Sequence, residues 1–514
     1  VIAQITNPKD NLTWTIQANG KIVTYTTALT AASETLIGTV TGSNARGATY
    51  YNNYIYVFGT GTSKNDVSRI GPLNTLPYDG QSGNFTVGLT VTGGTSGATG
   101  VIVADVDAGA TGTLTLSNIN GLFVNNETIT DTSTGSAAVN RTHASLITDG
   151  VWTGATLGSL TALTDTVYPS LRGVMIPNHH GHVHGDNSLY FCDFINGQGL
   201  IHRINTKKVT NEGDTNGTTV ASAYNVLDLP FGFYPVAIES FNTNIIVLGI
   251  YLTDTSTNQG KSAFVIWAPT NTTSWDIGPV YLPDPLATAV KNINGLIHIW
   301  SGNAQNGVRV SRYLGSGESV KDLAYQEEGL PPFQNAVDAL GNRIVWGGFN
   351  TTPAVGSAVF AYGSKDSRIP TGLHNIAKGS GAGTSPIVTS LKFVQQSSNV
   401  TPKLIIASHD GTGDQIDKYS ATATLASYIR FMFNLGQKGE IKKIKIPLAG
   451  AVAANTTITP KLWFDDLSTS KTLTVINNTN YPSKRSIIYK GPELKDTTFY
   501  NNFLLELAYT GTNP

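Results

Sequence analysis

The chain has 514 residues and a formal net charge of −1, and charged residues make up 13% of it, against about 25% in an average soluble domain. This balance gives no counterion-release drive toward nucleic acid and no basic face for an anionic membrane, and no apolar run approaches the roughly 18 to 20 residues of a membrane span. The single cysteine, Cys192, excludes an intrachain disulfide framework, and its apolar neighbours predict a small buried side chain.

Six segments share one pattern, a turn rich in Asn or Gly followed by an almost continuous apolar run. They are 51–59, 187–192, 242–249, 294–300, 341–347 and 402–408. A second β-branched or aromatic segment follows each of them after roughly 13 to 19 residues, as a hairpin requires. From the second unit onward the period is roughly 50 to 60 residues, near the long end of the range for propeller blades. We therefore predict an all-β chain with a β-propeller of six or seven blades, whose inner strands are apolar because neighbouring blades cover them.

Two regions depart from this period. The first interval is too long for one blade, and its excess alternates apolar residues with Thr or Ser and places Gly at turns, which predicts a small antiparallel β-module inserted in a blade loop. After about residue 421, strands with alternating polarity predict a C-terminal β-sandwich. The expected domains are 1–78 (N-terminal strands and first blade), 79–148 (inserted module), 149–422 (remaining blades) and 423–514 (sandwich).

Four of the nine histidines lie within six positions, directly before an apolar run. In an extended segment His180, His182 and His184 share one face, with successive members about 6.6 Å apart. Neutral imidazoles on one face can bind a transition metal, so these three are the candidate metal ligands. The alternative is a solvent-facing loop or an outer strand before a blade, which the flanking glycines and the lack of a distant ligand motif favour. Two further histidines, His202 and His298, are expected to be ordinary strand residues with a hydrogen-bond partner.

Catalytic motifs are weak. The chain contains no Gly-x-Ser-x-Gly elbow and no phosphate-binding Gly-Lys-Ser/Thr loop. The paired carboxylates Glu327-Glu328 and Asp465-Asp466 are more typical of turns and surfaces than of an acid–base pair. Three carboxylates in segment 409–417 fit a hairpin turn better than a Ca²⁺ loop. We therefore predict no enzymatic activity, no catalytic residue and no cofactor.

The inserted module carries the one resemblance. Thr-Ser-Gly-Ala-Thr-Gly at 95–100, Leu-Thr-Leu at 114–116, Gly-Leu-Phe at 121–123 and Glu-Thr-Ile-Thr at 127–130 resemble the small β-modules of structural proteins in tailed bacteriophages, especially marine ones. With the propeller pattern, the chain resembles the propeller-bearing nozzle or adaptor proteins of phage tails. The resemblance implies a virion protein in a homo-oligomeric ring, with adaptor, portal-proximal and fibre proteins as partners, DNA as passing cargo and no membrane span.

Two other functions stay open at this point. A receptor-binding tail-tip or fibre protein would adsorb to host cells. A secreted carbohydrate-binding or glycan-hydrolysing propeller would carry sugar-stacking aromatic residues at a central pocket, for which Trp300 and Trp346 are the candidates. Fold alone does not decide among these functions.

Overall fold

The structure is a computed structural model. It describes residues 1–6, 12–25, 34–40, 45–61, 66–141, 147–148, 179–205, 222–251, 261–270, 274–303, 307–313, 315, 320–326, 330–341, 343–348, 358–363, 373–378, 387–394, 402–409, 414–418, 427–448, 452, 455–464, 470–482, 486–494 and 500–510. In these ranges the regular elements are strands and two short 3-10 turns, η2 (Gln334–Ala336) and η3 (Gly491–Glu493).

Seven antiparallel sheets form the blades of a β-propeller. The first blade is β1 (Ala3–Thr6), β2 (Thr13–Ile16), β3 (Lys21–Tyr25) and β4 (Glu34–Thr39); the second is β5 (Gly47–Tyr51), β6 (Tyr54–Thr60), β7 (Asp66–Ile70) and β14 (Ile147–Thr148). The third is β15 (Gly181–Val183), β16 (Leu189–Ile195), β17 (Gln198–Ile204) and β18 (Ser222–Phe231); the fourth is β19 (Phe233–Phe241), β20 (Asn244–Tyr251), β21 (Lys261–Trp267) and β22 (Ile277–Tyr281).

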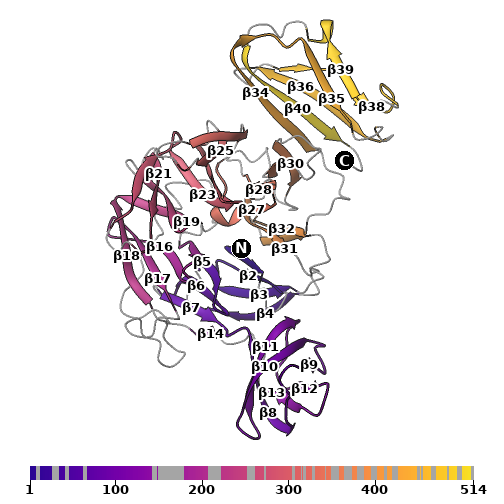
Figure 1. The fold of residues 1–514 in the computed structure, drawn as a ribbon. Coiled ribbons are helices and arrows are strands. Elements are labelled where there is room, and N and C mark those ends of the chain that lie inside the picture. Colours follow the sequence, from indigo (N-terminus) through magenta and orange to yellow (C-terminus); the bar gives the residue numbers. More distant parts are fainter. Residues whose placement is uncertain are drawn as a thin grey trace.

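The remaining three blades complete the ring. The fifth is β23 (Leu286–Ile293), β24 (Leu296–Asn303), β25 (Gly307–Tyr313) and β26 (Val320–Gln326); the sixth is β27 (Val337–Leu340), β28 (Arg343–Gly347), β29 (Ala358–Tyr362) and β30 (Leu373–Lys378); the seventh is β31 (Ile387–Val394), β32 (Lys403–His409) and β33 (Asp414–Lys418). The innermost strands are neighbours in the order β1, β5, β15, β19, β23, β27 and β31, and β31 lies against β1. The ring is therefore closed, and the blades surround one axis (Figure 1).

Tight turns join successive strands in several blades. Asn52 and Asn53 both have positive φ, and so do the pairs Asn196-Gly197 and Asn294-Gly295. Positive φ at both central residues is the requirement of the two-residue turn that matches the twist of antiparallel strands, and Asn and Gly are the residues that adopt it most readily. The Asn-rich turns recognised in the sequence are thus the hairpin turns of the blades.

The second strands of the blades are buried on both faces. In β20 every residue from Ile245 to Ile250 is buried, and its side chains are divided between two apolar clusters, each of which includes residues of a neighbouring blade. At about 25 cal/mol per Å² of apolar surface, this burial between blades is the main source of ring stability. Trp300 of β24 and Trp346 of β28 are both 0% exposed and pack against each other between the fifth and sixth blades, with ring centroids 6.2 Å apart.

A closed six-stranded barrel is inserted in the second blade. Its strands, in spatial order, are β10 (Thr99–Asp107), β11 (Gly112–Asn120), β8 (Thr75–Gly83), β13 (Ser136–Val139), β12 (Thr128–Asp131) and β9 (Thr90–Gly93). The chain enters the barrel after β7 and returns to β14, which pairs with β7 through Ile147 and Ile70. The barrel has its own apolar core and projects from the ring (Figure 1).

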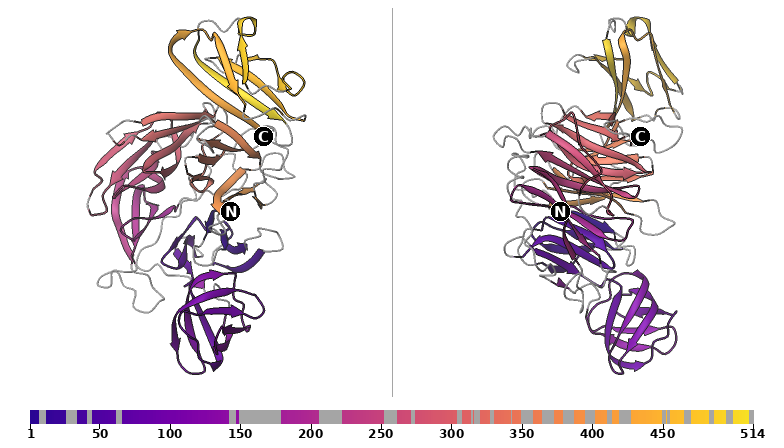
Figure 2. Two further views of the ribbon diagram at one scale, coloured as in Figure 1. Left: turned by 45° about the vertical axis from the view of Figure 1, so that its right-hand side comes forward. Right: turned by 60° about the vertical axis from the view of Figure 1, so that its left-hand side comes forward.

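A β-sandwich follows the seventh blade. One sheet contains β34 (Ser427–Gly439), β40 (Tyr500–Thr510), β36 (Thr457–Phe464), β37 (Ser470–Thr472) and β38 (Ile476–Asn477), and the other contains β35 (Lys443–Pro447) and β39 (Ser486–Lys490). Strand β34 also pairs with β30, so the first sheet continues the sixth blade. Both views in Figure 2 keep the barrel and the sandwich at opposite ends of the ring.

The predicted all-β class, with a propeller, an inserted β-module and a C-terminal sandwich, is confirmed, and the blades number seven. The segment 1–78, expected to hold N-terminal strands and the first blade, contains the first blade, three strands of the second and the start of the barrel, whose strands run from Thr75 to Val139. Among the described residues, no helix is long and apolar enough to cross a membrane.

Candidate functional site

A polar cavity of about 270 Å³ lies on the propeller axis. Every innermost strand contributes a residue to its wall, so the cavity is built by the whole ring rather than by one blade. The residues, in blade order, are Gln4, Thr49, His182, Glu239, Lys291, Val337 and Lys392. His180, directly before β15, completes the wall. Concave sites with a few convergent polar groups are the usual locations of ligand binding in proteins.

Three charged residues of the wall occupy equivalent positions in their strands. The pairing of β19, β23 and β31 with their second strands shifts in register just before Ala237, Ala289 and Ser390. Two residues after each shift stands a charged residue, namely Glu239, Lys291 or Lys392. A bulge of this kind re-aims the side chains that follow it. The repeated irregularity therefore explains why otherwise apolar strands present charges to the axis.

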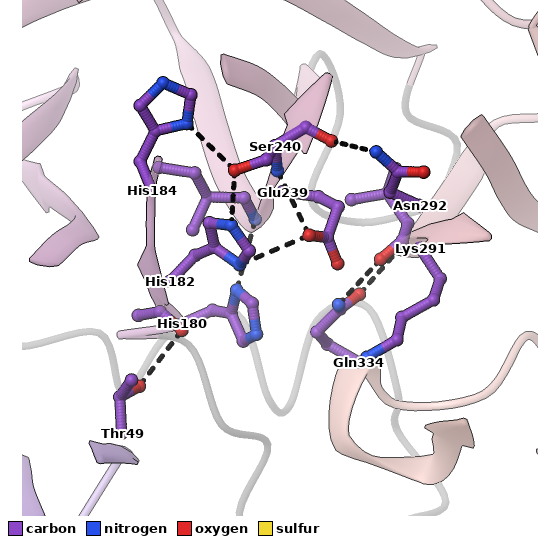
Figure 3. A network of polar contacts seen from close by, with 12 residues as sticks. Thr49, His180, His182, His184, Glu239, Ser240, Lys291, Asn292 and Gln334 are labelled. Atoms are coloured by element: carbon purple, nitrogen blue, oxygen red, sulfur yellow. Dashed lines mark hydrogen bonds and ion pairs between the residues drawn. The ribbon is translucent and has the colours of Figure 1, made fainter. Parts of the chain in front are cut away.

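Glu239 belongs to a hydrogen-bonded network that joins the third and fourth blades (Figure 3). Nδ1 of His182 lies 3.3 Å from Oε1 of Glu239, and Nε2 of the same ring lies 2.7 Å from Oγ of Ser240. Nδ1 of His184 lies 2.8 Å from the same Oγ, and its Nε2 lies 3.2 Å from the carbonyl oxygen of Thr243. Figure 3 shows His182 between Ser240 and Glu239.

The partners in this network restrict where its protons lie. Because a carbonyl oxygen only accepts, His184 carries a proton on Nε2. With neutral His184, the Ser240 hydroxyl donates to Nδ1 of His184 and accepts from Nε2 of His182. Nδ1 of His182 then faces the Glu239 carboxylate, and this contact is attractive only when the pair shares one further proton. Burial lowers the pKa of His182 and Glu239 opposes that shift, so the shared proton is easily given up.

His180 is held in one neutral form. Its Nδ1 accepts a hydrogen bond from the backbone N–H of Ile238 at 3.1 Å, which leaves the proton of the neutral ring on Nε2. Burial lowers the pKa of His180 to about 3, and the nearby His182 and Lys291 reinforce the effect. His180 therefore offers an uncharged N–H donor at the cavity wall across the ordinary pH range.

Two lysines face a single carboxylate. Nζ of Lys291 lies 3.9 Å from Oδ1 of Asp338, and Nζ of Lys392 lies 3.9 Å from Oδ2. Oδ2 also accepts the backbone N–H of Phe393 at 2.7 Å, which fixes the carboxylate against β31. Asp338 raises the pKa of Lys392, but burial and the neighbouring Lys291 outweigh it, so that pKa is lowered overall.

Gln4 has an unsatisfied amide. Its side chain is only 7% exposed, and neither Nε2 nor Oε1 has a hydrogen-bond partner among the described residues. Leaving a buried polar group unpaired costs about 1 to 3 kcal/mol, so such groups call for a partner. Because Gln4 lines the cavity, a ligand or water there would supply that partner.

The structure separates the three histidines proposed as metal ligands. His180 and His182 line the cavity, whereas His184 turns to Ser240 and Thr243. Among the described residues, no group of three His, Cys, Asp or Glu side chains lies so that it could hold a metal ion. The metal site therefore stays a prediction, and the described residues provide no cluster of ligands for it.

The other residues named from the sequence have structural roles where the structure describes them. Trp300 and Trp346 are core residues and do not line the cavity, so their expected place at a central pocket was wrong. Nε2 of His202 pairs with Oδ2 of Asp193 at 3.0 Å, and His298 bonds its own strand, as expected. Cys192 is buried. The pairs Glu327-Glu328 and Asp465-Asp466, and residues 410–413 of the acidic turn, lie outside the described residues.

Comparison with known proteins gives similarity at the level of fold. No family model matches the sequence, and no curated protein matches it. Similar solved structures include an exo-β-1,3-galactanase from Phanerochaete chrysosporium with galactose (7% identity, 63% of this chain, 94% of that chain, TM-score 0.29). Another is a GH43_1 enzyme from Xanthomonas citri complexed with xylose (11% identity, 51% of this chain, 94% of that chain, TM-score 0.28). A third is a Mycobacterium tuberculosis puromycin-hydrolyzing peptidase (9% identity, 79% of this chain, 56% of that chain, TM-score 0.28). These values are too low to transfer a substrate or a mechanism.

One prediction is corrected by these findings. The sequence predicts a protein without enzymatic activity because it contains no catalytic motif. The three similar structures are all of enzymes, and the axial cavity brings Glu239 within 3.3 Å of His182, a contact that no local motif reveals. These findings contradict the prediction of no enzymatic activity.

Proposed function

We propose that the axial cavity binds a saccharide and that Glu239, assisted by His182, transfers the proton needed to cleave a glycosidic bond. The observation that carries the proposal is the Glu239–His182 pair, 3.3 Å apart, at the wall of a polar cavity. The volume of about 270 Å³ is near the lower limit of about 300 Å³ for ligand pockets, which fits a ligand of one sugar unit.

The polar groups of the wall suit a ligand rich in hydroxyl groups. A sugar hydroxyl donates one hydrogen bond and accepts others, and the Gln4 amide offers both donors and an acceptor that have no partner among the described residues. The N–H of His180 supplies a further donor. Tyr50 is the aromatic residue of the wall, and its hydroxyl donates to Oδ1 of Asn53 at 3.2 Å, which fixes the ring in place.

The chemical step uses the proton that the pair shares. Glu239 donates it to the oxygen that links two sugar units while the bond from that oxygen to the anomeric carbon breaks. Water then adds its hydroxyl to the anomeric carbon, and its proton returns to the Glu239 carboxylate. His182 and the backbone N–H of Ser240 hold the carboxylate in position. General acid–base catalysis of this kind contributes about 10²- to 10⁴-fold to a rate.

The test is hydrolysis of a panel of oligosaccharides by the purified full chain, followed by chromatography of the products. We expect cleavage of at least one of them, and Glu239→Gln should lower the rate by about 10²-fold or more. The matched control is Glu440→Gln, which removes an exposed carboxylate that pairs with Lys442 far from the axis. A panel that is neither bound nor cleaved, or equal rates for the Glu239→Gln variant and the original chain, would overturn the proposal.

The virion role implied by the phage-tail resemblance stays a prediction. The feature that supports it is the arrangement of the two outer modules, because the barrel and the sandwich project from opposite ends of the ring, where each could bind a different partner (Figure 2). Immunogold electron microscopy of native particles with antibody against the chain tests it. Label on tails supports a tail protein, and antigen confined to the particle-free fraction contradicts it.

A further inference from the structure

We infer that the ligand of the axial cavity carries a negatively charged group, as in a uronic acid or a sulfated sugar, and that Lys291 and Lys392 receive that group. The inference rests on the proposed function and adds the substrate class. It begins with the two lysines of the wall, whose ammonium groups share the single carboxylate of Asp338.

The ion pairs with Asp338 leave the lysine donors largely unused. Each Nζ lies 3.9 Å from its carboxylate oxygen, which is beyond hydrogen-bond length, so the pairs are electrostatic only. Each ammonium has three N–H donors, and the described residues supply no closer acceptor to either lysine. The lysine side chains are 30% and 35% exposed, whereas that of Asp338 is 8% exposed. The donors thus remain accessible while the acceptor is covered.

Glu239, the carboxylate that lines the cavity, already has two contacts within the protein. Glu239 faces His182 at 3.3 Å, and its Oε1 also accepts the backbone N–H of Ser240 at 3.1 Å. Its charge reaches Lys392, whose pKa it raises, but Glu239 forms no ion pair with either lysine among the described residues, and as a carboxylate it would repel an anion placed beside it. An anionic group is consequently expected on the side of the cavity formed by β23 and β31, away from Glu239.

Neutral donors add to the two charged ones. His180 and Gln4 both line the cavity, His180 carries its proton on Nε2, and the amide nitrogen of Gln4 has no partner among the described residues. Gln4 is the second, independent sign of a ligand, because its buried amide has no hydrogen-bond partner in the described part of the chain. A carboxylate or sulfate has only acceptor atoms, so it satisfies such a set of donors better than a hydroxyl group does.

The inference is tested by comparing two sugars that differ in one group. Binding of D-galacturonic acid and of D-galactose to the full chain is measured by calorimetry, with inorganic sulfate as a competitor. We expect galacturonate to bind about tenfold more tightly or better, equivalent to about 1.4 kcal/mol, and sulfate to compete with it. Lys392→Gln and Lys291→Gln should each remove most of that preference and leave the affinity for galactose nearly unchanged.

The controls separate the possible failures. Lys443→Gln changes an exposed lysine of the sandwich and should have no effect, and Lys392→Arg should retain the preference if the variant keeps its melting temperature. Equal affinity for the two sugars, or a preference that survives Lys392→Gln together with Lys291→Gln, would overturn the charged-ligand inference while saccharide binding stands. If no sugar binds at all, the proposed function itself fails.

Discussion

His182 lies between two oxygen atoms of neighbouring residues in β19, with Nδ1 3.3 Å from Oε1 of Glu239 and Nε2 2.7 Å from Oγ of Ser240. Among the groups that act on the pKa of His182, Glu239 raises it, whereas burial, Lys291 and His184 lower it. Glu239→Gln should therefore lower the pKa of His182 further. Histidine titration by NMR measures this directly, without any substrate.

Glu440→Gln is the control for that titration, because its carboxylate is remote from the axis. A pKa of His182 that is the same in the Glu239→Gln variant and in the original chain would contradict the electrostatic coupling on which the acid–base pair depends.

Stability should fall in mild acid because of His180. Its pKa is lowered to about 3 in the folded chain from an ordinary value of 6.5, so between these values the unfolded chain binds more protons than the folded one. The free energy of unfolding therefore decreases as the pH falls through 6.5 toward 3, with a slope of up to about 1.4 kcal/mol per pH unit from this residue.

Urea unfolding of the original chain and of His180→Gln, at several pH values in that range, checks the expectation. The variant should lose less stability than the original chain over the same interval, since Gln does not titrate. Parallel curves for the two proteins would show that His180 is protonated as readily in the folded state as in the unfolded state.

Arg46, at the start of the second blade, should be replaceable with a gain in stability. It is 2% exposed, and its three guanidinium nitrogens are buried without a hydrogen-bond partner among the described residues. Burial lowers its pKa, which means that the charge itself is disfavoured there. Arg46→Met keeps the aliphatic volume and removes the unpaired charge, so we expect a gain of about 1 kcal/mol or more in the free energy of unfolding.

The matched variant is Arg309→Met, which removes a paired arginine. Nε of Arg309 lies 3.0 Å from Oδ2 of Asp284, a buried carboxylate, so this change should lower the melting temperature. Loss of stability in both variants would show that Arg46 has a partner that stabilises it.

Glu127 should be essential for the barrel although it lies far from the axis. Its carboxylate accepts the backbone N–H groups of Thr95, Ser96 and Val124 at 2.7 to 3.1 Å, and also the Ser96 hydroxyl. Glu127→Gln replaces one acceptor oxygen by a donor that faces backbone donors, which should cost about 1 to 3 kcal/mol. Hydrogen exchange at residues 93–98 measures the loss. Asp107→Asn, at an exposed turn where Asp107 accepts the N–H of Gly109, is the control and should change exchange little.

The sequence predicts the blades well because each repeats a local signal. An Asn or Gly turn with positive φ and a fully buried second strand need no distant information, and both appear in β20 and its turn at Asn242. The first blade escapes this pattern because its strands are short, and β1 alternates polar and apolar residues at Gln4 and Ile5. The first blade is recognised only in the structure, where β1 packs against β31 and closes the ring.

The site is less predictable because its residues come from every blade. His182 is singled out by the histidine-rich segment, but its partner Glu239 lies on the next blade, and the sequence offers no reason to pair them. The signal that could have revealed the site is an alignment of blades, in which Glu239, Lys291 and Lys392 occupy one position after the same register shift. No sequence pattern singles out Gln4. What marks it is a buried amide without a hydrogen-bond partner among the described residues, which only the structure reveals.

The seam between β1 and β31 gives the cavity a further property. Because its wall runs from Gln4 to Lys392, the cavity cannot exist on any fragment that lacks the seventh blade, nor on a ring opened at this seam. Ligand binding can then occur only to the fully closed ring, and the binding free energy is added to the stability of all seven blades together. A ligand in this position contacts both sides of the seam, so its departure removes one of the links that hold the first and seventh blades together.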